Sequence, residues 1–186
     1  WVSRSGYTGE DGFEISVPQT VAVKLAKLLV ACEDVEFVGL GARDSLRLEA
    51  GLCLYGHDID IHTSPIEAGL SWAIQKRRKT EGGFPGVDRI LSDLSEGPPI
   101  KRVGLQPLGK APMRRGIKLF QTEKSTKEIG KMTSGGFGPT IGAPVSMGYV
   151  SSEFSNPNTI LFAEIRGKRL PAKTLKLPFT GPNFKR

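Results

Sequence analysis

The sequence predicts an α+β protein, in which an α/β region (residues 1–97) precedes an all-β region (residues 98–186). Apolar residues recur at three- and four-residue spacing in the first region, as at Val21 and Leu25, which is typical of helices with one buried face. Beyond Gly97-Pro98-Pro99, short apolar runs alternate with Gly, Pro, Ser and Asn, which is typical of an antiparallel barrel or sandwich. The diproline segment is the best candidate for a linker between two domains.

The first predicted element is a strand that follows a glycine-rich turn. The run of residues 4–16 contains three glycines, and its second half alternates between apolar and polar side chains. The alternation predicts that Phe13, Ile15 and Val17 are buried and that Glu14 points away from the core. A carboxylate held on a strand can accept paired N–H donors of a ligand, although most charged side chains are simply solvated. Spacing alone leaves both interpretations of Glu14 open.

Two helices are expected next. Apolar spacing predicts the first over about residues 18–32, and the second over residues 42–51, ending at a glycine. On the second helix, Arg43 offers a planar fork of five N–H donors that suits carboxylate or carbonyl groups. The ring of Tyr7 can stack or form a hydrogen bond. Tyr7, Glu14 and Arg43 are therefore a candidate binding set, provided that the fold brings them together.

Two polar stretches of the first region allow alternative interpretations. Residues 55–62 combine aspartates with both histidines, and these side chains are common ligands of zinc and iron. No metal-ligand spacing accompanies them, so caps and turns are favoured. Residues 76–79 are four adjacent cations that could contact phosphate. No aromatic residues are interleaved with them, so a solvated turn is favoured over nucleic-acid binding.

The remaining elements follow from caps and apolar runs. Residues 64–67, Ser-Pro-Ile-Glu, form a capping box that predicts the start of a helix reaching Ile74, and residues 87–94 predict a short helix. Turns are expected at Gly135-Gly136 and Gly167-Lys168. Six apolar runs predict the strands of the all-β region, at residues 103–105, 117–120, 129–132, 146–150, 160–165 and 174–177.

Composition narrows the class of protein. The chain has 186 residues, a hydrophobic fraction of 38% and a net charge of +7, which fits a globular protein with acidic partners or anionic ligands. Cys32 and Cys53 are isolated, which favours reduced, buried thiols of an intracellular protein. No apolar run is long enough to cross a bilayer, and no basic-then-apolar leader is present. The first residue, Trp1, indicates a processed end or a fragment. No nucleophile-elbow, phosphate-loop or paired-cysteine motif nominates a catalytic residue.

Longer stretches of the sequence resemble the aminomethyltransferase family, the T-protein of the glycine cleavage system. The resemblance covers nearly the whole chain in order and corresponds to the C-terminal half of that family. The stretches that carry it are residues 4–15 (RSGYTGEDGFEI), 42–52 (ARDSLRLEAGL), 55–59 (YGHDI), 63–72 (TSPIEAGLSW), 109–114 (GKAPMR), 130–136 (GKMTSGG) and 147–150 (MGYV).

The resemblance implies a fold and an activity. Residues 1–97 would be part of a folate-binding α/β domain, and residues 98–186 a C-terminal antiparallel β-barrel domain. Family members transfer the one-carbon unit from the aminomethyl-lipoyl arm of the H-protein to tetrahydrofolate, giving methylenetetrahydrofolate, ammonia and dihydrolipoyl H-protein. The resemblance thus implies tetrahydrofolate as co-substrate, lipoylated H-protein as partner and the mitochondrial matrix as location. It implies no metal, nucleic acid or membrane.

The resemblance also implies site residues. Glu14 matches the family glutamate that holds the pterin edge, and Tyr7 and Arg43 match other folate-site positions. Arg114 matches a family arginine of the barrel domain near the site. Phe184 stands where family members commonly have tyrosine, so a hydroxyl is absent there. The essential family aspartate belongs to the N-terminal half, so this chain carries no catalytic residue of its own, and we expect it to be inactive alone.

Two related classes remain as alternatives. One is the folate-dependent C-terminal region of dimethylglycine or sarcosine dehydrogenases, which a flavin domain precedes. The other is a non-catalytic folate-binding relative involved in iron–sulfur assembly. Members of the latter carry a Gly-Cys-Tyr-x-Gly-Gln motif, whereas this chain has Ser5-Gly6-Tyr7-Thr8-Gly9-Glu10.

Overall fold

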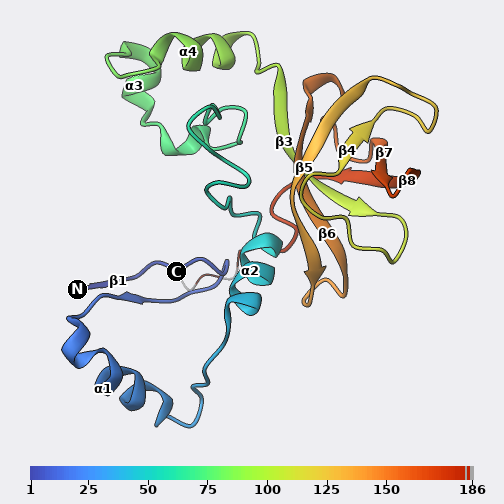
Figure 1. Ribbon diagram of the computed structural model, residues 1–186. Coiled ribbons are helices and arrows are strands. Elements are labelled where there is room, and N and C mark those ends of the chain that lie inside the picture. The colour runs from blue at the N-terminus through green and yellow to red at the C-terminus, as the bar shows by residue number, and fades with distance from the viewer. Residues whose placement is uncertain (183, 185–186) are drawn as a thin grey trace.

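The chain begins with a short antiparallel hairpin that extends away from the rest of the molecule (Figure 1). The structure, a computed structural model, describes residues 1–182 and 184. Strands β1 (Val2–Ser3) and β2 (Glu14–Ile15) pair with each other only, with Val2 opposite Ile15. The predicted strand is thus present but shorter than expected. Its apolar face is not buried, since Phe13 is 68% exposed. No second layer of the described chain packs over the hairpin.

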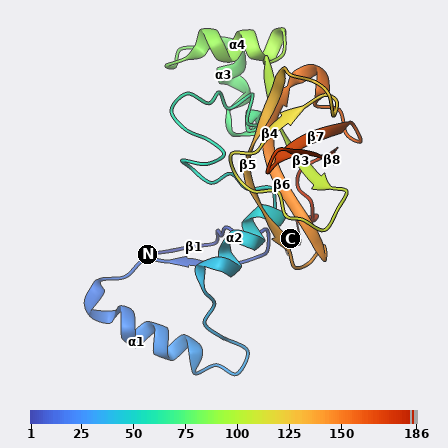
Figure 2. The same ribbon diagram turned by 45° about the vertical axis from the view of Figure 1, so that its right-hand side comes forward.

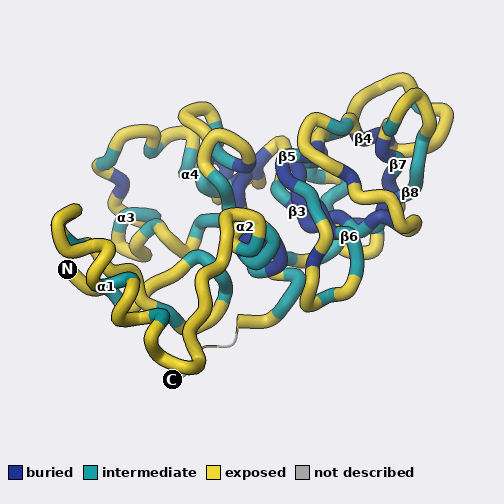
Figure 3. The backbone as a smooth tube through the Cα atoms, turned by 60° about the horizontal axis from the view of Figure 1, so that its bottom comes forward, coloured by how far each residue is buried: buried dark blue, intermediate teal, exposed yellow. Residues whose placement is uncertain are grey.

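Two helices follow, close to their predicted positions. Helix α1 (Gln19–Val30) contains no buried residue, and α2 (Leu40–Glu49) buries only its last three residues. Within the described chain, the first buried residue is Arg47. Figure 3 shows this gradient, because the tube from the N-terminus through α1 is yellow and teal, whereas dark blue begins at α2. Helix α2 therefore connects an exposed region to the buried centre of the molecule.

The segment between α2 and the barrel is made of turns and short helices. The capping box at Ser64 is present, since the Glu67 carboxylate accepts the Ser64 N–H at 2.9 Å. The predicted helix there is wrong, because a single turn leads into the 3₁₀ helix η1 (Ser71–Ala73). The four cations lie not in a turn but on helix α3 (Lys76–Glu81), for which lysine and arginine have good propensity. Helix α4 (Val87–Ser95) confirms the last predicted helix.

The second half of the chain is a closed six-stranded antiparallel barrel, which confirms the predicted fold class (Figures 1 and 2). The strand order around the barrel is β3-β6-β5-β4-β7-β8, and the 3₁₀ helix η2 (Ser152–Phe154) follows β6. Closure leaves neither edge strand unpaired. The strands are β3 (Ile100–Pro107), β4 (Lys118–Phe120), β5 (Glu128–Gly138), β6 (Ala143–Ser151), β7 (Ile160–Ile165) and β8 (Lys168–Leu175).

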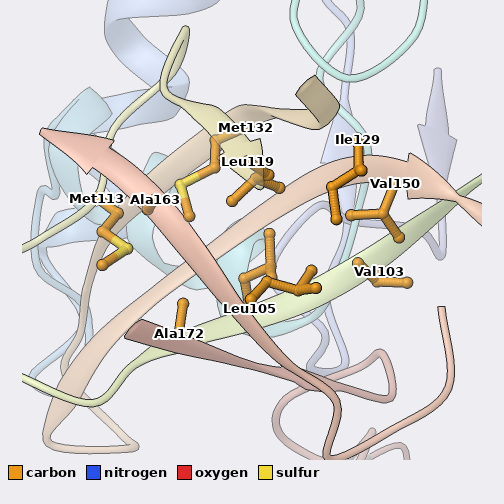
Figure 4. Packing of buried hydrophobic residues seen from close by; sticks show 10 residues of the cluster. Val103, Leu105, Met113, Leu119, Ile129, Met132, Val150, Ala163 and Ala172 are labelled. Carbon is orange, nitrogen blue, oxygen red and sulfur yellow. The ribbon is translucent and has the colours of Figure 1, made fainter. Parts of the chain in front are cut away.

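The barrel interior holds the main hydrophobic core (Figure 4). Leu105, Leu119 and Leu161 are completely buried there and come from three different strands. The turn predicted at Gly167-Lys168 is confirmed, because Arg166 and Gly167 adopt positive φ between β7 and β8. The turn predicted at Gly135-Gly136 is wrong, since both residues lie within β5 and pair with β6.

Candidate functional site

The ring of Tyr7 and the guanidinium of Arg43 are stacked. The Arg43 carbon Cζ lies 4.4 Å from the centroid of the ring, which is cation–π geometry. The Tyr7 hydroxyl donates to the backbone carbonyl of Cys53 at 2.5 Å. Burial raises the pKa of this hydroxyl, and the nearby positive charge of Arg47 opposes the shift. Tyr7 therefore remains a neutral hydrogen-bond donor. Arg43 packs on the face of its ring, and its hydroxyl anchors the ring to the backbone at Cys53.

Glu14 lies on β2 next to the glycine-rich turn. Its Oε2 atom accepts a hydrogen bond from the Ser5 hydroxyl at 2.5 Å, which orients the carboxylate. Its Oε1 atom accepts no hydrogen bond from the described residues. The turn itself is closed by an ion pair between Arg4 and Asp11 at 3.1 Å. An oriented carboxylate with one oxygen still available can accept N–H groups from a ligand.

Tyr7, Glu14 and Arg43 line the same cavity, which we call the Tyr7 cavity. Its volume is about 500 Å³, a size that suits a small organic ligand. Val38 of the loop before α2 and Leu40, the first residue of α2, supply its apolar wall. The structure thus brings together the three residues that the sequence nominated from positions far apart in the chain.

A second cavity lies on the other side of the glycine-rich turn, and we call it the strap cavity. Its volume is about 630 Å³, and it is bounded by the turn and by the C-terminal strap, residues 177–182, followed by Phe184. Ser5, Gly6, Asp11 and Gly12 line both cavities, so the turn is their common wall.

Gly9 explains why the turn can lie so close to helix α2. It is the one glycine of the turn with positive φ, at 81°, and a Cβ atom there would lie 2.7 Å from the Cβ of Ala50. Any side chain at this position would clash and would also be strained. The glycine at position 9 therefore allows the turn to pack closely on the end of α2.

The remaining two nominated residues lie apart from the Tyr7 cavity. Phe184 lines the strap cavity and is 52% exposed. Arg114 is exposed in the loop before β4 and lines neither cavity. Its neighbour Arg115 donates to the carbonyl of Gly56 at 2.8 Å, so this loop contacts the segment after α2. A role for Arg114 in ligand binding stays a prediction.

A buried ionic network holds the segment that anchors Tyr7. The Arg47 guanidinium donates to the carboxylate of Asp58 at 2.8 Å and to the hydroxyl of Ser134 on β5 at 3.0 Å. Asp58 also accepts the backbone N–H of Leu54 at 2.9 Å, next to the carbonyl that receives Tyr7. Because Arg47, Asp58 and Ser134 are buried and hydrogen-bonded to one another, the network fixes residues 52–58 between α2 and the barrel.

The same network explains the polar loop of residues 55–62. Asp58 is consumed by the ion pair, and Asp60 closes its own turn by accepting the N–H of His62 at 2.9 Å. That hydrogen bond lowers the pKa of Asp60. In the described part of the chain, no three metal-ligand side chains gather, and no helix is long and apolar enough to cross a membrane.

The cysteines are both free, but their predicted burial is wrong. Cys32 is exposed just after α1, because that helix has no layer packed over it, and Cys53 is half-buried. Burial raises the pKa of the Cys53 thiol.

Sequence reasoning missed three parts of the site. The sequence pattern gives Ser5 no role, although Ser5 lies only two residues before Tyr7 in the predicted turn. The apolar residues Val38 and Leu40 lie between the two predicted helices, outside any predicted element. The Cys53 carbonyl is a backbone group, which no residue pattern could nominate.

Comparisons with known proteins agree with this architecture. The GCVT N-terminal domain family matches residues 1–78, and the glycine cleavage T-protein C-terminal barrel domain family matches residues 101–180. The chain belongs to the glycine cleavage T-protein family. Its fold is similar to the crystal structure of glycine cleavage system aminomethyltransferase T from Bartonella henselae, with a TM-score of 0.93 and 46% identity. That likeness covers 100% of this chain and 51% of the other.

Curated relatives carry the name aminomethyltransferase, mitochondrial. The protein from Flaveria anomala is 52% identical over 99% of this chain, and the one from Dictyostelium discoideum is 50% identical over the whole chain. A probable aminomethyltransferase from Schizosaccharomyces pombe is 48% identical over 98% of the chain. The chain spans 45–47% of the length of these relatives. The similarity therefore extends over about half the length of each of these relatives.

Proposed function

We propose that this chain forms part of a mitochondrial aminomethyltransferase of the glycine cleavage system and carries a large share of its tetrahydrofolate site. The observation that carries the proposal is the Tyr7 cavity, where Tyr7, Glu14 and Arg43 converge in a chain of this family. The proposed reaction moves a one-carbon unit from the aminomethyl-lipoyl arm of the H-protein to tetrahydrofolate and releases ammonia.

Each residue of the cavity has a defined part in this proposal. The available oxygen of Glu14 accepts N–H groups at the pterin edge, while Ser5 keeps the carboxylate oriented. Arg43 binds carbonyl or carboxylate oxygens of the folate. One face of the Tyr7 ring supports Arg43, and the other face provides a flat surface on which the folate stacks. These residues bind and orient the folate, and none of them acts as a nucleophile.

The net charge of +7 supports the proposed binding of folate and of the H-protein. A basic protein attracts both the anionic glutamate tail of folate and an acidic carrier such as the H-protein.

We also propose that Phe184 and Arg114 contact the folate at its outer end, and that the chain divides into two domains after residue 97. The start of β3 at Ile100, just beyond the diproline segment, supports that division.

Binding of a stable folate tests the proposal directly. Calorimetric titration of the 186-residue chain with 5-formyltetrahydrofolate should give saturable binding, and Glu14→Gln should weaken it roughly tenfold, because a charge-assisted hydrogen bond is lost. Glu33→Gln, an exposed carboxylate outside both cavities, is the matched control and should bind like the unmodified chain. Equal affinity of the Glu14 and Glu33 variants would remove Glu14 from the site.

A further inference from the structure

Glu49, the last residue of α2, is a buried carboxylate that the proposed function does not use. It is 2% exposed. Its Oε1 atom accepts the N–H groups of Thr140 at 2.8 Å and Ile141 at 3.0 Å, and its Oε2 atom accepts the Thr140 hydroxyl at 3.0 Å. These donors lie at the tip of the hairpin that joins β5 and β6. In the described structure, therefore, Glu49 is satisfied by neutral donors of a single turn rather than by a cation.

The backbone of the same residue holds a different part of the chain. The Glu49 carbonyl accepts the N–H groups of Phe179 at 3.0 Å and Thr180 at 3.2 Å, which belong to the C-terminal strap. One residue thus binds the hairpin tip through its side chain and the strap through its main chain. The hairpin tip and the strap lie far apart in sequence from α2 and from each other.

Packing joins the two contacts of Glu49. Ile141 of the hairpin tip and Phe179 of the strap both pack against a small core cluster that contains Leu48, the neighbour of Glu49. A shift of the hairpin tip therefore changes the surface on which the strap rests, since packed interiors transmit small displacements. Glu49 controls the position of the tip through three hydrogen bonds.

The strap forms one wall of the strap cavity, and the glycine-rich turn forms the other. The turn rests on Ala50, the residue that follows Glu49. Both walls of the cavity thus contact the same end of α2. We propose that Glu49 is a positioning residue for the ligand site, which sets the strap against the turn and so fixes the width of the strap cavity. The ligand part of this inference rests on the proposed folate site.

The reach of the side chain, rather than its charge, is the property that this role requires. Glutamine at position 49 keeps the length and an oxygen for the two N–H donors, and the Thr140 hydroxyl can rotate to accept from its amide. Aspartate keeps the charge but is one methylene shorter, so it cannot reach the hairpin tip. Glu49→Asp should therefore loosen the strap, and Glu49→Gln should leave it nearly unchanged.

Hydrogen exchange and folate binding together test the inference. In the 186-residue chain, Glu49→Asp should speed amide exchange of the strap about tenfold and weaken 5-formyltetrahydrofolate binding by a similar factor, on the scale of one or two lost hydrogen bonds. Glu67→Asp shortens another buried carboxylate, which holds a turn outside both cavities, and is the matched control. It should leave strap exchange and folate affinity unchanged even where it lowers thermal stability.

The outcomes separate the inference from the proposed function. If the unmodified chain binds no folate but Glu49→Asp loosens the strap, the folate site is wrong and the hold on the strap stands. Unchanged strap exchange in Glu49→Asp overturns the positioning role, and so does a loosened strap with unaltered folate affinity. Should Glu49→Asp not fold, Ile141→Ala removes the packing contact of the same hairpin tip and is expected to loosen the strap in the same way.

Discussion

The barrel and the first 46 residues form regular structure by the same local rules but differ in what covers their apolar faces. The barrel closes on itself and buries leucines completely. In the first 46 residues no side chain is buried, and twelve of the twenty-one exposed large apolar side chains of the described chain lie before Ala42. Local patterning is therefore enough to specify a hairpin and helices, whereas burial requires a second layer.

Helix α2 lies at the boundary between these two regions, and two of its arginines show the contrast within a single turn. Arg43 faces the Tyr7 cavity and is exposed, while Arg47 is buried and hydrogen-bonded to Asp58 and to Ser134 of the barrel. The first is available for a ligand, and the second is a structural ion. Three changes would break or sharpen this comparison.

Removing the buried charge of Arg47 should have the largest effect. Arg47→Met leaves the Asp58 carboxylate buried without its cation, so the free energy of unfolding should fall by about 3–5 kcal/mol. Urea denaturation followed by circular dichroism measures this loss. Arg77→Met, which breaks the exposed pair with Glu81, is the control and should change stability by no more than about 0.5 kcal/mol. Similar losses in both variants would contradict a buried network at the boundary.

Leucine truncation compares the two regions directly. Leu161→Ala opens a cavity in the barrel core and should lower the free energy of unfolding by about 2–5 kcal/mol. Leu28→Ala on α1, where the side chain is 60% exposed, should change it by less than about 0.5 kcal/mol. The same denaturation experiment serves for both. A large loss for Leu28→Ala would mean that α1 is covered in solution.

Chemical modification of the two cysteines is the mildest test, because it leaves the fold intact. Iodoacetamide should modify Cys32 before Cys53, since Cys32 is exposed and burial raises the pKa of the Cys53 thiol. A raised pKa lowers the thiolate fraction near neutral pH, so modification of Cys53 should accelerate as the pH rises towards that pKa. Mass spectrometry over a series of pH values follows both sites, and Cys32→Ser isolates the slower one. Equal rates at neutral pH would contradict the difference in burial.

Most elements could be predicted because they depend on local chemistry. The periodicity of α1 and α2, the capping hydrogen bond at Ser64 and the turn before Lys168 all follow from residues near each other in sequence. Burial could not be predicted in the same way. The alternation of Phe13 and Ile15 correctly indicates a strand with an apolar face, but it carries no information on whether another layer is present to cover that face.

Long-range contacts caused the clearest error. Gly135 looks like a turn residue, yet it lies inside β5 and pairs with Ser146 of β6. A glycine is needed there because a Cβ atom would lie 1.8 Å from the carbonyl oxygen of Met113. A glycine required for close approach has the same appearance in sequence as a glycine required for a turn. Likewise, the convergence of Tyr7, Glu14 and Arg43 depends on a fold that spacing alone does not encode, and only the resemblance to a family indicated it.

The hydrogen bond from Tyr7 to the Cys53 carbonyl has a consequence for substitutions at position 53. The acceptor is part of the main chain, so it persists whichever amino acid occupies position 53. A substitution at position 53 that keeps the backbone in place can thus remove the thiol without removing the acceptor that holds the ring. The aromatic anchor depends on the hydroxyl of Tyr7 and on the course of the backbone at residue 53, and not on the side chain of that residue.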